Sequence, residues 1–390
     1  MKKLFLLMAA LLPLSWAVAQ EQSAEDNGIK FLEGTYAEAL QVAKEAGKPL
    51  FVDCYTQWCG PCKQLAKTTF KDAQVGEMFN SSFICLKLDM ETPDGVAQKD
   101  KFGVSAYPTM VFVDPETEEV IHKMVGFCGA QEFLKRTTAG MSGNNIKNMT
   151  ARYNAGERSD EFMLDYINVL REANAKEQLA ALVPSFLNDK CELMLTDRKI
   201  FSLFMSYIDD PYSKPYVYFL ENKAKFIEAY NEMQVNMKER FTWNRWGLKF
   251  VKKNDDGSYT YDKEGMAAYK KYMKSYKVKD IKKVELGAQM HYAECTGDWK
   301  TYLSCGDKMI AKYNADPLDV YNWALRIDKN CTDQKQRNHA AIWCDDMKAS
   351  LEAEEAKAAA AAQGGARAMR MGPQPTHFAT MASKLRNIEF

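Results

Sequence analysis

The segment Trp58-Cys59-Gly60-Pro61-Cys62 contains two cysteines two residues apart, a spacing that occurs both in metal half-sites and in redox pairs. The apolar run before it, Pro49-Leu50-Phe51-Val52-Asp53-Cys54-Tyr55, is typical of a buried strand. The residues after it, 63–67, predict a helix, and Pro61 suits its first turn because a proline there sacrifices no hydrogen bond. Cys59 is therefore expected at a strand-to-helix junction, at the N-terminus of the helix.

This placement predicts redox chemistry at the two cysteines. The helix dipole and the unpaired N–H groups of the first turn stabilise a thiolate at Cys59 and make it nucleophilic. Cys62 lies one turn further on, where its thiol can attack a mixed disulfide formed at Cys59. The alternative is a zinc site, which needs a second Cys-x-x-Cys or a pair of histidines, whereas the four histidines are scattered singly. We therefore predict a redox-active dithiol, with neither a metal nor another cofactor.

Over about residues 30 to 141 the chain resembles the thioredoxin superfamily. Beyond the five-residue motif, the residues that carry the resemblance are Asp53, Lys87, Tyr107-Pro108-Thr109 and Val125-Gly126. Asp53 stands six positions before Cys59, where thioredoxins keep a buried carboxylate, and Lys87 matches the lysine that accompanies it. The stretch 37–49 is more similar to secreted thiol–disulfide interchange proteins than to small cytosolic thioredoxins.

The expected order of secondary structure agrees with that family. Thr35 and Glu38 predict a capped helix that Gly47 ends. The other expected elements are strands at 50–56 and 83–88, helices at 72–79 and 93–102, a hairpin of 110–113 with 120–125, and a helix at 130–141. Together with the helix after the dithiol, they predict an α/β thioredoxin fold, a central mixed sheet flanked by helices.

The resemblance also implies roles for the remaining site residues. Asp53 is expected to take the proton of Cys62, since burial raises the pKa of a carboxyl group without a full partner, and Lys87 is expected to moderate that shift. A purely structural Asp53–Lys87 pair is the alternative. The bond before Pro108 is expected to be cis and to shape the groove beside the dithiol. The expected substrate-binding residues are Trp58, Gly60, Pro61, Tyr107, Pro108 and Gly126.

Two details bear on specificity and direction. Tyr107 is larger than the usual residue before this proline, so it is expected to narrow the groove or to cover Cys59. The Gly60-Pro61 pair is that of thioredoxin, whose potential of about −270 mV lies roughly 7 kcal/mol below that of the strongest periplasmic oxidant at about −120 mV. We therefore predict a reductant or an isomerase. Cys54 and Cys85 are expected to be small buried residues on opposite faces of the sheet.

Composition and the N-terminus bound the setting of this chemistry. The chain has 52 basic and 52 acidic residues, so nothing indicates nucleic acid as a partner. Residues 1–19 combine Lys2-Lys3, an apolar run and Ala17-Val18-Ala19, which predicts a cleaved signal peptide. The apolar run is too short for a membrane anchor. We therefore predict an exported protein, periplasmic or secreted, in a compartment where disulfides persist.

The pattern changes beyond the thioredoxin-like region. We predict a signal peptide at 1–19, a flexible lead at 20–30, a thioredoxin-like domain at 31–141, a boundary at 142–145, an all-helical domain of helical hairpins at 146–352 and a low-complexity, disordered tail at 353–390. Sequence echoes around Cys295 and Cys331 and around Cys305 and Cys344 favour a tetratricopeptide-like helical repeat; an irregular helical domain is the alternative.

Two functions from different classes fit this sequence. The first is an exported thiol–disulfide oxidoreductase that reduces or isomerises disulfides in partner proteins and draws electrons from a membrane or soluble donor. The second is a binding or chaperone-like protein in which the helical domain holds partners and the thioredoxin fold is mainly a scaffold. The intact dithiol together with Asp53, Lys87 and Pro108 favours the enzyme, because a scaffold needs none of these residues.

Overall fold

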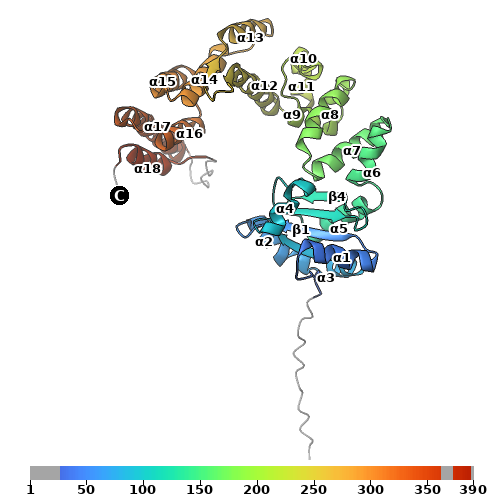
Figure 1. The fold of residues 1–390 in the computed structure, drawn as a ribbon. Helices are drawn as coiled ribbons and strands as arrows, with labels where there is room; N and C mark the ends of the chain where they lie inside the picture. The colour runs from blue at the N-terminus through green and yellow to red at the C-terminus, as the bar shows by residue number, and fades with distance from the viewer. Residues whose placement is uncertain (1–26, 362–371, 388–390) are drawn as a thin grey trace, which may run out of the picture. The chain divides into compact units, whose positions relative to one another are not determined.

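The structure is a computed structural model that describes residues 27–361 and 372–387 (Figure 1). The predicted signal peptide at 1–19 and most of the predicted lead lie outside the described residues. The chain divides into two compact units, of which the first ends at Leu182 and the second begins at Val183. We describe each unit by itself.

The first unit contains the mixed sheet. Its elements are α1 (Tyr36–Ala46), β1 (Leu50–Tyr55), α2 (Gly60–Lys67), α3 (Ala73–Ser82), β2 (Ile84–Asp89), α4 (Pro93–Phe102), β3 (Thr109–Val113), β4 (Val120–Val125), α5 (Ala130–Met141), α6 (Ile146–Asn154) and α7 (Asp160–Glu172). The strands lie in the order β2-β1-β3-β4; β1 and β2 are parallel, while β3 is antiparallel to both β1 and β4. This architecture confirms the predicted thioredoxin fold.

Local signals begin and end these helices where the sequence predicts. Thr35 and Glu38 form a complete capping box at the start of α1, and Gly47 ends the helix at φ 59°. Asp72 caps α3 by accepting hydrogen bonds from two backbone N–H groups of its first turn. Gly103 ends α4 at φ 57°, a left-handed conformation that glycine adopts without a steric penalty.

Alternate residues of β1 enter two different cores. Leu50, Val52 and Cys54 pack with α1 and α4 on one face of the sheet. Phe51 packs on the other face with Cys85 and with residues of α2, α3 and α5. Because successive strand residues point to opposite faces, Asp53 lies on the α2 side. Cys54 and Cys85 are thus buried on opposite faces, as predicted.

The described end of the predicted flexible lead is fixed against the first unit, so that prediction is wrong for residues 27–30. The backbone N–H of Ile29 donates to the Phe70 carbonyl at 2.8 Å, and that of Lys30 donates to Asn80 Oδ1 at 2.8 Å. Gly28 is buried, and a Cβ added to it would lie 2.3 Å from the Phe70 carbonyl oxygen. The chain therefore needs glycine at this close approach.

The first unit continues past the predicted boundary at 142–145. Helices α6 and α7 both pack against β4, the edge strand of the sheet. Glu172 at the end of α7 approaches Arg136 of α5, with 3.7 Å between Oε2 and Nε, and buried His122 of β4, with 3.9 Å between Oε2 and Nε2. The first two helices after the predicted boundary are therefore part of the sheet-containing unit.

The second unit is built mainly from helices. Helix α8 (Lys176–Asn188) crosses the division, and the elements after it are α9 (Arg198–Tyr207), α10 (Lys214–Glu221), α11 (Lys223–Ala229), α12 (Glu232–Gly247), β5 (Val251–Lys253), β6 (Tyr259–Tyr261), α13 (Lys263–Ser275), α14 (Ile281–Thr296), α15 (Trp299–Tyr313), α16 (Pro317–Asn330), α17 (Gln334–Ala361) and α18 (Pro375–Leu385). Helices α14 and α15 form a hairpin around Gly297, and α16 packs against α17. The tetratricopeptide-like repeat stays a prediction.

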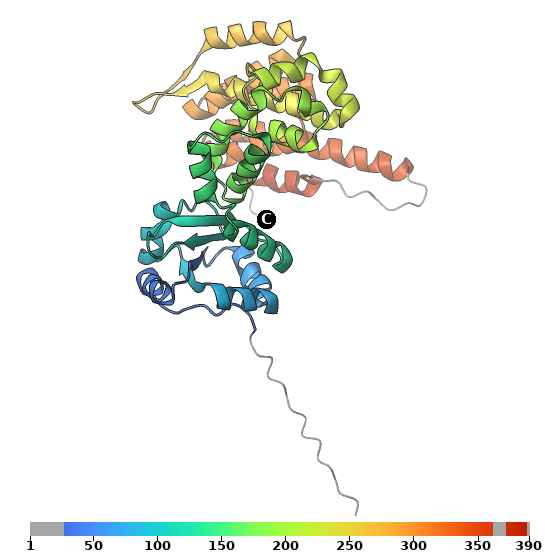
Figure 2. The ribbon, with the colours of Figure 1, turned by 90° about the vertical axis from the view of Figure 1, so that its right-hand side faces the viewer.

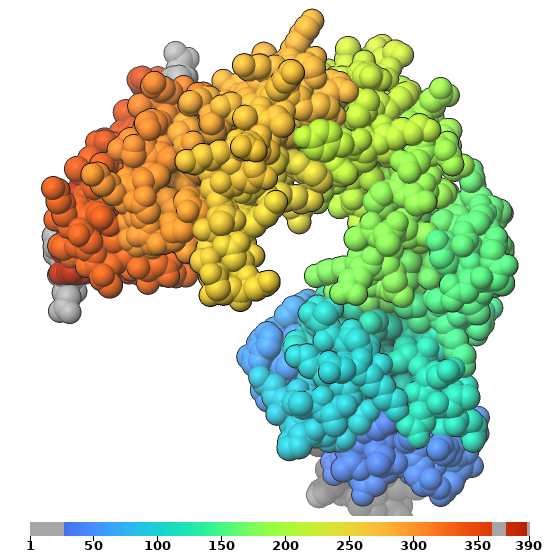
Figure 3. Space-filling model, turned by 45° about the horizontal axis from the view of Figure 1, so that its top comes forward, coloured from blue at the N-terminus to red at the C-terminus, as the bar shows by residue number. Residues whose placement is uncertain are grey.

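Strands β5 and β6 contradict the prediction of an all-helical region at 146–352. They form an antiparallel hairpin with Lys252 opposite Thr260, and its yellow surface stands out from the neighbouring helices (Figures 2 and 3). Gly257 in the connecting turn has φ 83°. The sequence marks this turn as a helix break, but strands of only three residues give no recognisable alternation.

The predicted disordered tail at 353–390 is also wrong for its described residues. Helix α17 continues to Ala361, and α18 packs against it. Four side chains of α18 are buried in the core of the second unit, namely Phe378, Met381, Ala382 and Leu385. The apolar residues recur at helical spacing after the low-complexity stretch, and burying them offsets the entropy of ordering α18.

Candidate active site

The two cysteines of the motif are joined at the N-terminus of α2. Cys59 is the N-cap residue of the helix, and its Sγ accepts a hydrogen bond from the backbone N–H of Cys62 at 3.1 Å. A disulfide links Cys59 to Cys62, with 5.3 Å between their Cα atoms. Both residues are almost fully buried, whereas Gly60 and Pro61 between them are exposed. The site thus presents its backbone turn to solvent and keeps its sulfur atoms covered.

Asp53 is a buried acidic residue on the α2 side of the sheet. It is 3% exposed, and its Oδ1 makes no hydrogen bond among the described residues. Burial raises the pKa of its carboxyl group to about 7, and the charge of Lys87 partly opposes that rise. A cavity of about 160 Å³ is lined by Asp53, Cys62 and Lys87 together. The structure therefore brings three of the four predicted catalytic residues to one cavity, and the fourth, Cys59, is bonded to Cys62.

Lys87 faces Asp53 across the parallel strands but forms no direct ion pair with it. The two residues are register partners in β1 and β2. The Lys87 ammonium lies 4.8 Å from the centroid of the Phe31 ring and 5.8 Å from that of Phe70, where it makes cation–π contacts. Its charge thus acts on Asp53 at longer range, and the structural alternative of a closed Asp53–Lys87 pair is not what the described residues show.

Aromatic side chains border the disulfide on its exposed side. Trp58 is 67% exposed, and its ring meets the half-buried Tyr107 edge to face at 5.8 Å between centroids. The Trp58 indole N–H donates to Glu91 Oε1 at 2.9 Å. An exposed tryptophan that is held in place in this way presents a preorganised apolar face beside the dithiol.

The loop before β3 and the end of β4 form the next wall. The Tyr107–Pro108 peptide bond is cis, and Pro108 is buried. The Pro108 carbonyl accepts a hydrogen bond from the Gly126 N–H at 2.9 Å. Gly126 has φ 90°, and a Cβ added to it would meet no atom within 4 Å. Because β1 and β3 are antiparallel, this wall lies at the same edge of the sheet as the end of β1, from which the chain leads to Cys59.

Several residues of this site were missed in the sequence. Glu91 holds Trp58, and Gln57 donates through Nε2 to Asp89 Oδ2 at 2.9 Å. Thr56 lines the cavity, and its buried hydroxyl group has no hydrogen-bond partner within the described part of the chain. The carboxyl ends of parallel strands meet at one edge of a sheet, so the polar residues just after β1 and β2 were a usable signal for these contacts.

The remaining eight cysteines are free thiols. Half-buried Cys128 accepts a weak contact from Arg136 Nη1 at 3.6 Å, and burial raises the pKa of its thiol. Within 27–361 and 372–387, no helix is both long and apolar enough to cross a membrane. The same residues contain no group of three or more His, Cys, Asp or Glu side chains placed to hold a metal ion.

Comparisons with known proteins match the sheet-containing part of the chain. A family model described as thioredoxin-like matches residues 31–115. The chain is 31% identical over 100 residues to the thiol:disulfide interchange protein DsbD of Pseudoalteromonas atlantica, a match that covers 25% of this chain and 17% of the relative. It is 30% identical over 120 residues to DsbD of Haemophilus influenzae, a match that covers 29% of this chain and 21% of that relative. The matches thus span about a fifth of these relatives.

Two solved structures match a similar share of the chain. A putative disulphide-isomerase from Bacteroides thetaiotaomicron is 47% identical and matches 30% of this chain and 97% of its own, with a TM-score of 0.28. The oxidised C-terminal domain of Neisseria meningitidis DsbD is 24% identical, and the match covers 27% of this chain and 90% of that domain, with a TM-score of 0.24.

The family model, the mixed sheet and the dithiol at the start of α2 show that this part of the chain is a member of the thioredoxin superfamily. Among the named relatives, it is similar to thiol–disulfide interchange proteins.

Proposed function

We propose that the protein is a thiol–disulfide oxidoreductase that reduces or isomerises disulfides in exported partner proteins. The observation that carries the proposal is the arrangement of the dithiol. Cys59 caps the N-terminus of α2, and Cys62 shares a cavity with a buried carboxyl group whose pKa is raised to about 7. A nucleophile at a helix N-terminus and an acid–base group beside the second thiol are the two parts that dithiol exchange needs.

The reduced protein starts the exchange at Cys59. Its thiolate attacks one sulfur of a partner disulfide, forms a mixed disulfide and releases the other sulfur as a thiolate that takes up a proton. Cys62 then loses its proton and attacks Cys59 Sγ. The Cys59–Cys62 disulfide forms, and the partner leaves as a dithiol with two electrons and two protons gained. A dithiol donor returns the protein to its reduced form by the reverse exchange.

Asp53 is the group that accepts the proton from Cys62. The two residues line one cavity, whose volume of about 160 Å³ leaves room for water between them. At neutral pH a carboxyl group with a pKa of about 7 is present in both forms, so it accepts the proton during oxidation of the dithiol and returns it during reduction. The charge of Lys87 keeps the pKa of the Asp53 carboxyl group from rising further.

Partner proteins contact the face formed by Trp58, Tyr107 and Gly126. Trp58 offers an exposed apolar surface, and the open space beside Gly126 admits a polypeptide backbone close to the dithiol. The backbone of Tyr107, just before β3, can pair with an extended segment of the partner, a mode of recognition in which main-chain hydrogen bonds supply the affinity. Gly60 and Pro61 expose the turn that such a segment approaches.

The direction and the place of action rest on the sequence. Gly60-Pro61 is the dipeptide of thioredoxin, which supports reduction or isomerisation over oxidation. Residues 1–19 have the composition of a signal peptide, which supports export to a periplasmic or extracellular space. A protein that reduces disulfides there draws its electrons from a membrane or soluble donor. The alternative, a binding protein with an idle thioredoxin scaffold, leaves the raised pKa of Asp53 and its cavity without a role.

Reduction of insulin by dithiothreitol, followed as turbidity, tests the proposal. We expect the full-length protein to accelerate the reaction and the Cys59→Ser variant to lose that effect. Cys295→Ser is the matched control, because Cys295 is a partly buried free thiol of the second unit. Equal rates for the wild type and Cys59→Ser would reject the proposed activity. For identification of partners, Cys62→Ser is expected to retain them as mixed disulfides on Cys59.

A further inference from the structure

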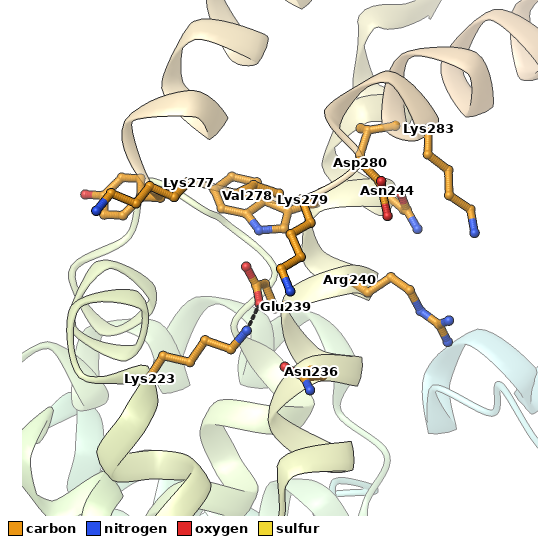
Figure 4. Close-up of a pocket in the computed structure, with 13 residues that line it drawn as sticks. Lys223, Asn236, Glu239, Arg240, Asn244, Lys277, Val278, Lys279, Asp280 and Lys283 are labelled. Atoms are coloured by element: carbon orange, nitrogen blue, oxygen red, sulfur yellow. Dashed lines mark hydrogen bonds and ion pairs between the residues drawn. The ribbon is translucent and has the colours of Figure 1, made fainter. Parts of the chain in front are cut away.

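The second unit contains a pocket that the redox chemistry does not use. Its volume is about 510 Å³, and it lies between α12, the loop at 276–280 and the start of α14 (Figure 4). This volume is in the range of ligand-binding clefts. Five basic side chains line it, namely Lys223, Arg240, Lys277, Lys279 and Lys283, against the two acidic side chains of Glu239 and Asp280. The wall is therefore positively charged although the whole chain has no net charge.

Most of this positive charge is not neutralised within the pocket. Lys223 forms an ion pair with Glu239. Among the described residues, the other four basic side chains have no ion pair. The Asp319 carboxylate of α16 acts on two of them, Arg240 and Lys283, at longer range. Figure 4 shows the charged ends of Arg240 and Lys283 on one side of the pocket. Cations gathered in a cleft raise the local concentration of an anionic ligand.

A buried tryptophan supplies a second, independent sign of a ligand. Trp243 lines the pocket, is 2% exposed and packs against the rings of Tyr216, Tyr269 and Tyr272. Its Nε1 has no hydrogen-bond partner among the described residues. The indole N–H is a donor only, so an acceptor such as a carboxylate oxygen is the group that satisfies it.

The start of α14 adds to the same field. The helix has 16 residues, and its N-cap residue Asp280 lines the pocket. Among the residues that the structure describes, no side chain caps its first turn. The first N–H groups of a helix carry partial positive charge and favour negatively charged groups. The helix terminus, Trp243 and four basic side chains without an ion pair among the described residues therefore line the same pocket.

An exposed apolar stripe adjoins the pocket on α12. Met233, Met237 and Phe241 recur every four residues and are 70%, 39% and 54% exposed. Arg240 follows Met233 by seven residues and Asn244 follows Met237 by seven, so these pocket residues share a helix face with the stripe. Methionine side chains are flexible and adapt to irregular apolar partners. The surface thus combines an anion site with an adaptable apolar strip.

We infer that this surface binds an acidic segment of a partner polypeptide. Its carboxylates enter the pocket beside Arg240, Lys283 and Trp243, and its apolar side chains lie along Met233, Met237 and Phe241. A free small anion can bind the basic side chains of the pocket but leaves the apolar stripe exposed. A polypeptide that carries both carboxylates and apolar side chains therefore fits this surface better. This site is separate from the dithiol chemistry, so binding does not require Cys59 or Cys62.

Fluorescence anisotropy of the oxidised full-length protein tests the site. The probe is a fluorescein-labelled peptide of alternating Glu and Leu with Gly spacers, and its counterpart has Lys in place of Glu. We expect only the acidic peptide to bind, and its Kd to rise at least tenfold in the double variant Arg240→Gln, Lys283→Gln. The matched control is Lys271→Gln, Lys274→Gln on α13, which removes the same charge outside the pocket and leaves Kd unchanged.

Two further measurements separate the possible outcomes. Trp243→Phe keeps an aromatic ring and removes the N–H, and we expect it to weaken binding in a protein whose circular dichroism is unchanged. Insulin reduction by the Arg240→Gln, Lys283→Gln variant should equal the wild-type rate, which distinguishes this site from the proposed activity. Equal Kd values in pocket and control variants overturn the inference. Binding of inorganic phosphate at the pocket without binding of the peptide also overturns it.

Discussion

Asp53→Asn should both stabilise the first unit and slow its redox chemistry. The pKa of the Asp53 carboxyl group is raised from 3.8 to about 7, mainly by burial. At ~1.36 kcal/mol per pKa unit, holding the charged form in the folded state costs on the order of 4 kcal/mol above pH 7. Asparagine is of similar size and carries no charge at any pH, so the variant avoids this cost.

The sign of the pH dependence follows from which state binds more protons. Between about pH 4 and pH 7 the folded protein keeps Asp53 protonated while the unfolded chain does not. The contribution of Asp53 to stability is therefore largest at low pH and is lost as the pH rises towards 7. We expect the advantage of Asp53→Asn to be close to zero at pH 4 and to reach about 4 kcal/mol at pH 8.

Calorimetric unfolding of the oxidised full chain at pH 5 and pH 8 measures the first effect. The second is measured by rapid mixing: the rate at which Cys62 resolves a mixed disulfide should rise through about pH 7 in the wild type, and this rise should be absent from Asp53→Asn. Asp100→Asn, at an exposed position on α4, is the control for both measurements. An unchanged inflection in the Asp53→Asn rate profile would remove Asp53 from the mechanism, and an equal stability gain at both pH values would refute the buried charge.

Three further predictions concern reactivity and packing. In the reduced protein, Cys59 should react with iodoacetamide much faster than Cys62, because only Cys59 caps the helix; mass spectrometry measures this, and equal rates contradict the assignment. Gly140→Ala should lower the free energy of unfolding by ~1–3 kcal/mol, because the added Cβ would lie 2.2 Å from the buried histidine ring of β4. A Cβ added at Gly287 meets no atom within 4 Å, so Gly287→Ala should be neutral or stabilising in the same chemical denaturation assay. Arg337→Gln should lower the melting temperature of the second unit, because Arg337 donates to the last carbonyls of α18 at 2.8 and 3.2 Å; an unchanged calorimetric trace would show that these bonds add nothing.

The sequence by itself determined the features that depend on neighbouring residues. The capping box of α1, the glycine that ends it and the position of Cys59 at the start of α2 were all predicted, and the structure shows each of them. Helix caps and turns are decided by side chains within a few residues, so their signals are local. The strands of the sheet and the alternation that buries Cys54 and Cys85 on opposite faces could be predicted for the same reason.

The contacts that complete the site required the tertiary structure. Glu91, which follows β2, accepts a hydrogen bond from Trp58, which follows β1. The Lys87 ammonium lies over Phe31 and Phe70 instead of pairing with Asp53. Contacts such as these join residues far apart in the sequence, and each depends on the rotamers of long side chains. A short-range pattern can place these residues at one edge of the sheet, but it does not specify which side chains meet.

Tertiary packing also decided which segments are ordered and where the first unit ends. Residues 27–30 have the composition of a loose lead, yet backbone hydrogen bonds to Phe70 and side-chain contacts to Asn80 fix them. Helices α6 and α7 follow a turn that resembles a domain boundary, but they pack on the exposed edge strand β4. Helix α18 follows a low-complexity stretch and is held by the apolar surface of its neighbours. In each case local composition describes the isolated chain, whereas the free energy of burying apolar surface and pairing backbone groups depends on partners that only the folded structure brings together.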